Sequence, residues 1–115
     1  MSVSIVRHYY ELVDGRDVDG LVALFHPDAT YRRPGYDPLV GRAAIERFYR
    51  EERVIVSGAH RLRSIVTGGD DVAVEGSFTG ELRDGRSVTL DFADFFTVQS
   101  DLIVVRTTYF FVAAV

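Results

Sequence analysis

The sequence predicts an α+β domain in which three N-terminal helices pack on a curved antiparallel sheet. Apolar residues in the first half of the chain recur at the spacing expected of helices. The second half instead contains strand-like runs separated by short turns rich in Gly, Asp and Ser. Helices followed by a strand meander form layers around one core, and 115 residues are enough for one such core. We therefore expect residues 1–115 to form a single domain.

The first two predicted helices have recognisable boundaries. Apolar residues line one face of the first helix, which ends at Gly15. Asp17 is a suitable N-cap for a second, shorter helix that continues through Phe25 and stops at Pro27. A short strand is then expected at 29–33, before a loop that contains two prolines.

A third helix is expected after Gly41. Ile45, Phe48 and Tyr49 would form its buried face. The opposite face carries three pairs of opposite charge at i,i+4 spacing, namely Arg42–Glu46, Glu46–Arg50 and Arg47–Glu51.

Four strands are predicted in the second half of the chain. They cover residues 62–67, 72–83, 86–98 and 102–112. The turns between them contain Gly68-Gly69, Asp84-Gly85 and Ser100-Asp101, and Asp84-Gly85 is a strong two-residue hairpin signal. Three successive hairpins give a four-stranded antiparallel meander, and a bent sheet of this kind around helices leaves a conical cavity suited to a small ligand.

Composition excludes several classes of function. A net charge of −4 argues against a nucleic-acid partner, and no apolar run is long enough to span a membrane. The chain lacks cysteine and a signal-peptide pattern, so we expect a cytoplasmic protein without disulfides. Its three histidines are scattered and it has no glycine-rich phosphate-binding motif, so we expect no metal and no cofactor.

Two carboxylates interrupt one of the most apolar stretches, residues 90–96. In a strand, alternate side chains share a face, so Asp94 points the same way as Leu90, Phe92 and Phe96, whereas Asp91 points the other way. Burying an ionised carboxylate is costly without a partner. Asp94 is therefore either a member of a structural ion pair or a working group in an apolar pocket.

Four segments, 9–14, 24–30, 41–50 and 90–94, together resemble the ketosteroid isomerase branch of the NTF2-like (SnoaL-like) superfamily. The similarity follows the same order over nearly the whole chain. The resemblance implies a cone-shaped α+β barrel of the cystatin-like type. It also implies a homodimer that packs through the sheet.

The resemblance further implies roles for three residues. The isomerases form an oxyanion hole from a tyrosine on the first helix and a protonated aspartate on a late strand, and Tyr9 and Asp94 match these positions. A tyrosine on the third helix supports the first tyrosine, and Tyr49 matches it. The general base of the family is an acid immediately before the proline that ends the first strand. Here that position holds Arg33, which cannot abstract a proton at neutral pH.

Strand alternation and the resemblance together suggest which side chains surround Asp94. The expected substrate-binding residues are Phe25, Tyr31, Arg33, Glu75, Phe92, Arg106 and Phe110. If Arg33 or Arg106 reaches Asp94, the acid is ionised and is an ion-pair member or a base. If neither arginine reaches it, the acid is neutral and donates a hydrogen bond beside Tyr9.

Three functions are compatible with these residues. The first is an isomerase-like or lyase-like enzyme for a small apolar carbonyl compound, in which Tyr9 and Asp94 polarise the oxygen and Glu75 or a water replaces the lost base. The second is a non-catalytic module that binds an anionic or polar-headed small molecule through Arg33 and Arg106, or that only dimerises. The third is an epoxide hydrolase in which Asp94, Arg106 and Glu75 activate water.

Overall fold

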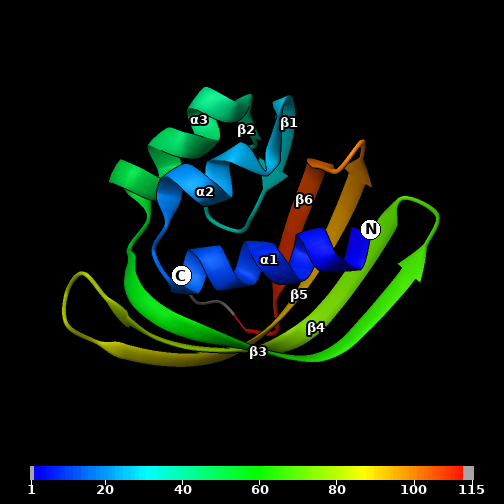
Figure 1. Ribbon diagram of the computed structural model, residues 1–115. Coiled ribbons are helices and arrows are strands. Elements are labelled where there is room, and N and C mark those ends of the chain that lie inside the picture. Colours follow the sequence, from blue (N-terminus) through cyan, green and yellow to red (C-terminus); the bar gives the residue numbers. More distant parts are fainter. Residues whose placement is uncertain (1, 113–115) are drawn as a thin grey trace.

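The computed structural model describes residues 2–112 and confirms an α+β fold built on one curved sheet (Figure 1). Helix α1 lies across the concave side of the sheet, and α2 and α3 lie beside β1 and β2 (Figure 1). No helix within residues 2–112 has the length and apolar character needed to cross a membrane. The elements are α1 (Ser2–Asp14), α2 (Val18–Ala23), β1 (Phe25–Arg32), β2 (Leu39–Val40), α3 (Arg42–Arg47), η1 (Phe48–Glu52), β3 (Ile55–Gly68), β4 (Asp71–Leu82), β5 (Ser87–Gln99) and β6 (Leu102–Phe110).

The helical half differs from the sequence prediction at two boundaries. Asp17 caps α2 as expected, because its carboxylate accepts a hydrogen bond from the Gly20 N–H at 2.9 Å. However, Phe25 begins β1 instead of ending the second helix. The last turn of the third helix is a π-helix, in which the Arg53 N–H donates to the Phe48 carbonyl at 2.8 Å. This wider turn carries Tyr49.

The sheet has the strand order β2-β1-β6-β5-β4-β3. The predicted meander from β3 to β6 is antiparallel throughout. Strand β1 joins it by pairing with β6 in parallel, so the sheet is mixed and not purely antiparallel. The two-residue strand β2 and the first half of β3, residues 55–61, were not predicted from the sequence.

The pairing of β3 with β4 is irregular near the middle of β3. The β3–β4 register shifts between Leu62 and Ser64, and such a bulge bends the strand that carries it. Gly76 faces this point, and a Cβ atom there would lie 2.3 Å from the Arg61 carbonyl oxygen. Only glycine therefore permits the close approach of the two strands at this irregularity.

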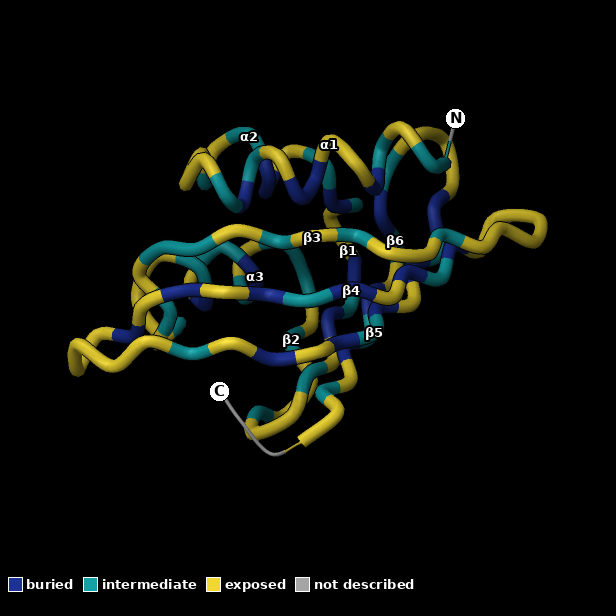
Figure 2. The backbone as a smooth tube through the Cα atoms, turned by 90° about the horizontal axis from the view of Figure 1, so that it is seen from below, coloured by how far each residue is buried: buried dark blue, intermediate teal, exposed yellow. Residues whose placement is uncertain are grey.

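Burial alternates along β4 and β5, as Figure 2 shows. The even-numbered residues of β4 and β5 face the helices, and most of them are buried, whereas the odd-numbered residues face outward and are exposed or half-buried. In β6 a register shift against β5 turns Ile103 inward, and Arg106 and Thr108 face inward further along the strand. Phe92, Asp94 and Phe96 therefore point inward and Asp91 points outward, as strand alternation predicted.

Candidate active site

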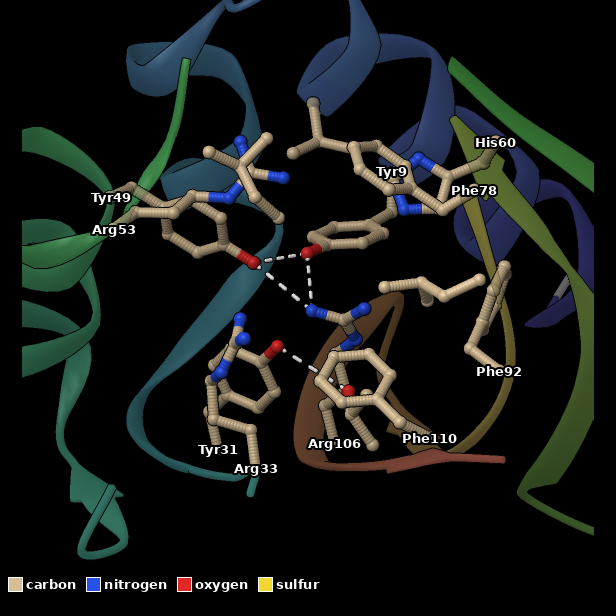
Figure 3. Close-up of a pocket in the computed structure, with 14 residues that line it drawn as sticks. Tyr9, Tyr31, Arg33, Tyr49, Arg53, His60, Phe78, Phe92, Arg106 and Phe110 are labelled. Carbon is tan, nitrogen blue, oxygen red and sulfur yellow. Dashed lines mark hydrogen bonds between the residues drawn. The ribbon is translucent and has the colours of Figure 1, made fainter. Parts of the chain in front are cut away.

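A cavity lies between the helices and the concave face of the sheet (Figure 3). Helix α1, strand β1 and the π-helical turn η1 contribute to one side, and β3 to β6 contribute to the other. Its lining residues are Tyr9, Val13, Tyr31, Arg33, Tyr49, Arg53, Ile55, His60, Phe78, Leu90, Phe92, Arg106, Thr108 and Phe110.

Most of the residues singled out from the sequence meet in this cavity. Those that line it are Tyr9, Tyr31, Arg33, Tyr49, Phe92, Arg106 and Phe110. Phe25, Glu75 and Asp94 do not line it, each for a different reason. The catalytic and binding roles of the lining residues remain predictions.

Two tyrosines and one arginine form the polar centre of the cavity. The hydroxyl groups of Tyr9 and Tyr49 are hydrogen-bonded to each other. Arg106 Nη1 donates to both of them, at 2.6 Å to Tyr9 Oη and 3.1 Å to Tyr49 Oη (Figure 3). The predicted support of Tyr9 by Tyr49 is therefore present as a direct contact. Arg106 is an additional partner of both phenols that the sequence did not indicate.

A count of hydrogens shows what this centre can offer to a ligand. Each phenol has one proton to donate. One of these protons is used between Tyr9 and Tyr49, and the guanidinium of Arg106 can only donate. One phenolic proton is therefore left over, and the adjacent cation makes it a stronger donor.

Burial keeps both phenols protonated. Loss of hydration raises the pKa of Tyr9 well above its ordinary value, although the Arg106 cation opposes the shift. The pKa of Tyr49 is raised for the same reason, again against the effect of Arg106. At neutral pH the two side chains are therefore hydrogen-bond donors and not phenolates.

Asp94 lies behind this centre and not at the cavity wall. It is completely buried, with an exposed fraction of 0%. Arg106 Nη2 donates to Asp94 Oδ2 at 2.9 Å, and the hydroxyls of Tyr10 and Thr108 also donate to the carboxylate. Asp94 is therefore the ion-pair partner of Arg106. Of the two alternatives left open by the sequence, the structure shows the one in which an arginine reaches Asp94, and Arg106 lies between Asp94 and the phenols.

Arg106 is packed between aromatic rings in addition to its hydrogen bonds. Its guanidinium carbon lies 4.7 Å from the ring centroid of Tyr9 and 4.6 Å from that of Tyr31. Burial alone lowers the pKa of Arg106, but the Asp94 carboxylate and the surrounding tyrosines raise it, and the net pKa is well above the ordinary value. The side chain is thus a fixed, permanent cation that links Asp94 to Tyr9 and Tyr49.

The prediction that Glu75 faces the cavity is wrong. Glu75 is exposed on the outer face of β4, and its neighbour Val74 is the residue opposite Asp94. A two-residue turn at Asp84-Gly85 would pair Arg83 with Arg86, and would therefore place Glu75 opposite Asp94.

The observed hairpin has a three-residue loop instead. Leu82 pairs with Arg86 through a 2.8 Å N–H to carbonyl bond, and the Gly85 N–H donates to the Leu82 carbonyl at 3.0 Å. Gly85 has a φ of +89°, as expected for the glycine that follows a type I turn in this loop class. The extra residue shifts the register by one position, and such a shift turns every side chain of the strand to the opposite face.

Phe25 is buried in the core on the far side of Tyr9. The centroids of the two rings are 5.9 Å apart in an edge-to-face arrangement. Phe25 therefore supports Tyr9 from behind and does not form the cavity wall that was expected. It has this position because it starts β1, whereas the sequence placed it at the end of a helix.

Arg33 does line the cavity and stacks on aromatic rings. Its guanidinium carbon lies 5.0 Å from the ring centroid of Phe48, 5.3 Å from Tyr36 and 5.6 Å from Phe110. The ion pair with Asp94 is made by Arg106 and not by Arg33. Arg33 thus places a cation at the wall, at the position where the resemblance would have placed the general base.

His60 is a lining residue that the sequence analysis missed. Its Nδ1 atom lies 2.6 Å from Asp14 Oδ1, and its backbone N–H donates to Asp14 Oδ2 at 2.9 Å. The ring packs against Tyr10, Phe78 and Phe92, with centroid distances of 4.7 to 5.4 Å. Because the predicted strand began at residue 62, the face to which His60 belongs could not be assigned.

The tautomer of His60 follows from its partner. An ionised carboxylate can only accept a hydrogen bond, so Nδ1 carries the proton that lies between His60 and Asp14. In the neutral ring Nε2 then has a free lone pair. Within residues 2–112, no group of three or more His, Asp and Glu side chains is placed to hold a metal ion.

The curved sheet, the helices on its concave side and the enclosed cavity define an NTF2-like domain. The chain belongs to the SnoaL-like domain family, whose model matches residues 6–106. Several solved structures share the fold at low sequence identity. An NTF2-like protein of unknown function from Burkholderia pseudomallei is 22% identical, with a TM-score of 0.86, and the match covers 95% of this chain and 89% of that one.

Two enzymes with this fold are also similar. The epoxide hydrolase/cyclase-like enzyme SalBIII, which takes part in pyran ring formation in the polyether salinomycin, is 23% identical with a TM-score of 0.84. That match covers 95% of this chain and 89% of the enzyme. An LEH-like epoxide hydrolase from M. tuberculosis is 18% identical with a TM-score of 0.83, and coverage is 95% and 81%.

Proposed function

We propose that this domain is an acid–base enzyme of the isomerase or lyase type that moves a proton on a small, mostly apolar carbonyl compound. The observation that carries the proposal is the presence, in one aromatic cavity, of a cation-backed phenol pair and a carboxylate-held histidine. The first group is suited to an oxyanion, and the second is suited to proton removal. The reaction needs both.

The phenol pair would bind the carbonyl oxygen. The remaining phenolic proton of Tyr9 and Tyr49 is donated to the oxygen, and Arg106 stabilises the negative charge that develops there. A preorganised donor of this kind is worth about 2.7–4 kcal/mol in the transition state. Asp94 acts indirectly, because it holds Arg106 in place.

His60 would replace the missing base. Nε2 removes a proton from the carbon next to the carbonyl group, and the C–H electron pair forms a carbon–carbon double bond while the carbonyl π pair moves onto oxygen. Asp14 stabilises the imidazolium that forms, through its hydrogen bond to Nδ1. Return of the proton to the same carbon or to a conjugated carbon completes exchange or isomerisation.

Two observations favour this carbonyl chemistry over the other functions considered. Asp94 does not line the cavity, and Glu75 faces outward, so neither carboxylate is placed to activate water on an epoxide. A module for binding alone would not need the Asp14–His60 pair at the cavity wall. If the domain only binds its ligand, the exchange experiment described next will show no acceleration by the protein.

The test is hydrogen exchange in small aryl ketones. The protein is expected to accelerate the incorporation of deuterium from D₂O next to the carbonyl of 1-tetralone or 1-indanone, as followed by proton NMR. Tyr9→Phe removes one donor of the phenol pair and is expected to slow the exchange. If the protein accelerates exchange in none of a panel of such ketones, the proposal is contradicted.

We also propose that the domain forms a homodimer through the outer face of the sheet. Four exposed apolar side chains gather there, Val66, Phe95, Val105 and Tyr109, with exposed fractions between 36% and 65%. Phe95 and Tyr109 contact each other edge to face, with centroids 5.9 Å apart. Exposed apolar groups that cluster in this way are typical of interaction surfaces.

Light scattering coupled to size exclusion tests the dimer. The wild-type protein is expected to have twice the chain mass of 12.9 kDa. Phe95→Glu combined with Tyr109→Glu places charges on the outer face and is expected to yield the monomer. Val40→Glu, on the exposed strand β2, is the control and should remain dimeric. A monomeric wild-type protein at micromolar concentration would exclude the dimer.

A further inference from the structure

A second cleft lies next to the cavity. It shares Val13, Tyr49, Arg53 and Ile55 with the cavity, so the two spaces adjoin along one wall. The charged residues among its described lining residues are four arginines and no carboxylates, and the arginines are Arg16, Arg50, Arg53 and Arg83. The remaining described lining residues are apolar except for Tyr49. We call this space the arginine cleft.

The positive charge of the arginine cleft is only partly neutralised. Arg50 forms ion pairs with Glu46, at 2.8 Å, and with Asp19. Arg83 donates to the Glu51 backbone carbonyl at 2.9 Å, which is a neutral acceptor. Arg53 lies over the ring of Tyr49, with 5.7 Å between the guanidinium carbon and the centroid. Within residues 2–112 no salt bridge involves Arg16, Arg53 or Arg83.

This concentration of cations contrasts with the chain as a whole. The protein has 17 acidic and 13 basic residues and a net charge of −4. The inner cavity also has arginines in its wall, but the charge of Arg106 is paired with the buried Asp94 behind it.

Arg16 adds an independent observation from the backbone. It follows the end of α1 with a φ of +58°, in the left-handed region where helices usually place Gly or Asn. A residue with a Cβ atom is unfavourable there. Unfavourable backbone conformations are often retained where the side chain has a function, and the side chain of Arg16 lines the cleft.

We infer that the ligand of this cavity is an amphipathic anion, with an apolar carbonyl-bearing body in the cavity and a carboxylate or phosphate group in the arginine cleft. The inference rests on the function proposed above and specifies its substrate class. Planar guanidinium groups match the oxygens of carboxylates and phosphates and form charge-assisted hydrogen bonds with them. A positive entrance on a negatively charged protein also directs anions to this opening.

Isothermal titration with three ligands that share one body tests this inference. The ligands are 4-oxo-4-phenylbutanoate, its neutral methyl ester, and 4-oxo-4-phenylbutyl phosphate. At least one of the two anions is expected to bind at least tenfold more tightly than the ester. Raising the NaCl concentration should weaken the binding of the anion and leave that of the ester nearly unchanged. Comparison of the carboxylate with the phosphate identifies which oxyanion the cleft prefers.

Matched variants connect the preference to the cleft. Arg53→Gln and Arg83→Gln are each expected to reduce the ratio of ester Kd to anion Kd severalfold. Arg61→Gln makes the same change of charge on the exposed face of β3, and should leave the ratio unaltered. Arg16→Gly should lower the ratio while raising the melting temperature, because glycine adopts a positive φ readily. A residue with only a structural role would not produce this combination.

The possible failures are distinguishable. Anions that bind no more tightly than the ester, or an Arg61→Gln effect as large as that of Arg53→Gln, would overturn the inference about the anion. Absence of anion binding would overturn it as well. Ketone exchange in D₂O is measured separately on neutral ketones, so its result decides the catalytic proposal whatever the titrations show.

Discussion

Replacement of His60 by glutamine is expected to lower kcat for proton exchange by about 10²–10⁴-fold, which is the usual contribution of a positioned general base. Glutamine keeps a polar side chain of similar reach but cannot accept a proton at neutral pH. KM should change little, because His60 contributes one edge of a wall that is otherwise aromatic and aliphatic. The measurement is steady-state exchange or isomerisation with the best ketone found in the panel.

Three companion variants separate catalysis from packing. Asp14→Asn keeps the shape but removes the charge that fixes the His60 tautomer, so kcat should fall while the fold is retained. His60→Ala should recover part of its activity when imidazole is added, which a purely structural histidine would not allow. His8→Gln alters an exposed histidine on α1 and should have no effect. A kcat for His60→Gln within twofold of wild type would exclude His60 as the base.

Replacement of Arg106 by methionine is expected to lower the free energy of unfolding by about 3–5 kcal/mol, the usual cost of removing one member of a buried ion pair. Arg106 is 5% exposed and Asp94 is 0% exposed. The variant therefore leaves an ionised carboxylate in the core, and it also removes a donor to Tyr9 and Tyr49. Urea unfolding followed by circular dichroism measures the difference.

A second ion pair provides the control for this experiment. Arg63 Nη2 lies 3.3 Å from Asp91 Oδ1, and the two side chains are 43% and 54% exposed. Solvent screening makes such a pair worth only about 0–1 kcal/mol, so Arg63→Met should cost no more than that. Asp94→Leu combined with Arg106→Met should be more stable than Arg106→Met alone, because no unpaired charge remains. If Arg63→Met and Arg106→Met lower the free energy of unfolding equally, the buried ion pair is not more important than the exposed one.

Side-chain direction was predictable wherever one residue of a strand could be oriented. The apolar run around Asp94 oriented β5, and alternation then placed Phe92 and Asp94 inward and Asp91 outward. The same reasoning placed Arg106 and Phe110 on the inner face of β6, and both line the cavity. Tyr9 and Tyr49 were identified through the resemblance, and they meet as it implied.

Reasoning from the sequence failed where the direction of a side chain depended on a one-residue shift in register or on where a strand begins. The three-residue loop at Gly85 turned Glu75 outward, although Asp84-Gly85 favours the shorter loop. Strand β3 begins at Ile55, seven residues before the predicted start, and this missing segment contains His60. Nothing in the spacing of Tyr10 on the first helix indicated its hydrogen bond to Asp94.

The amino-acid sequence by itself determined the α+β class, the meander and the inward face of its central strands. These features follow from local periodicity and turn chemistry, which neighbouring residues encode. Only the tertiary structure decided which of two arginines neutralises Asp94, and that Asp14 and His60 meet from segments 46 residues apart. Such contacts depend on register, bulges and helix placement, each of which is set by the packing of the whole core.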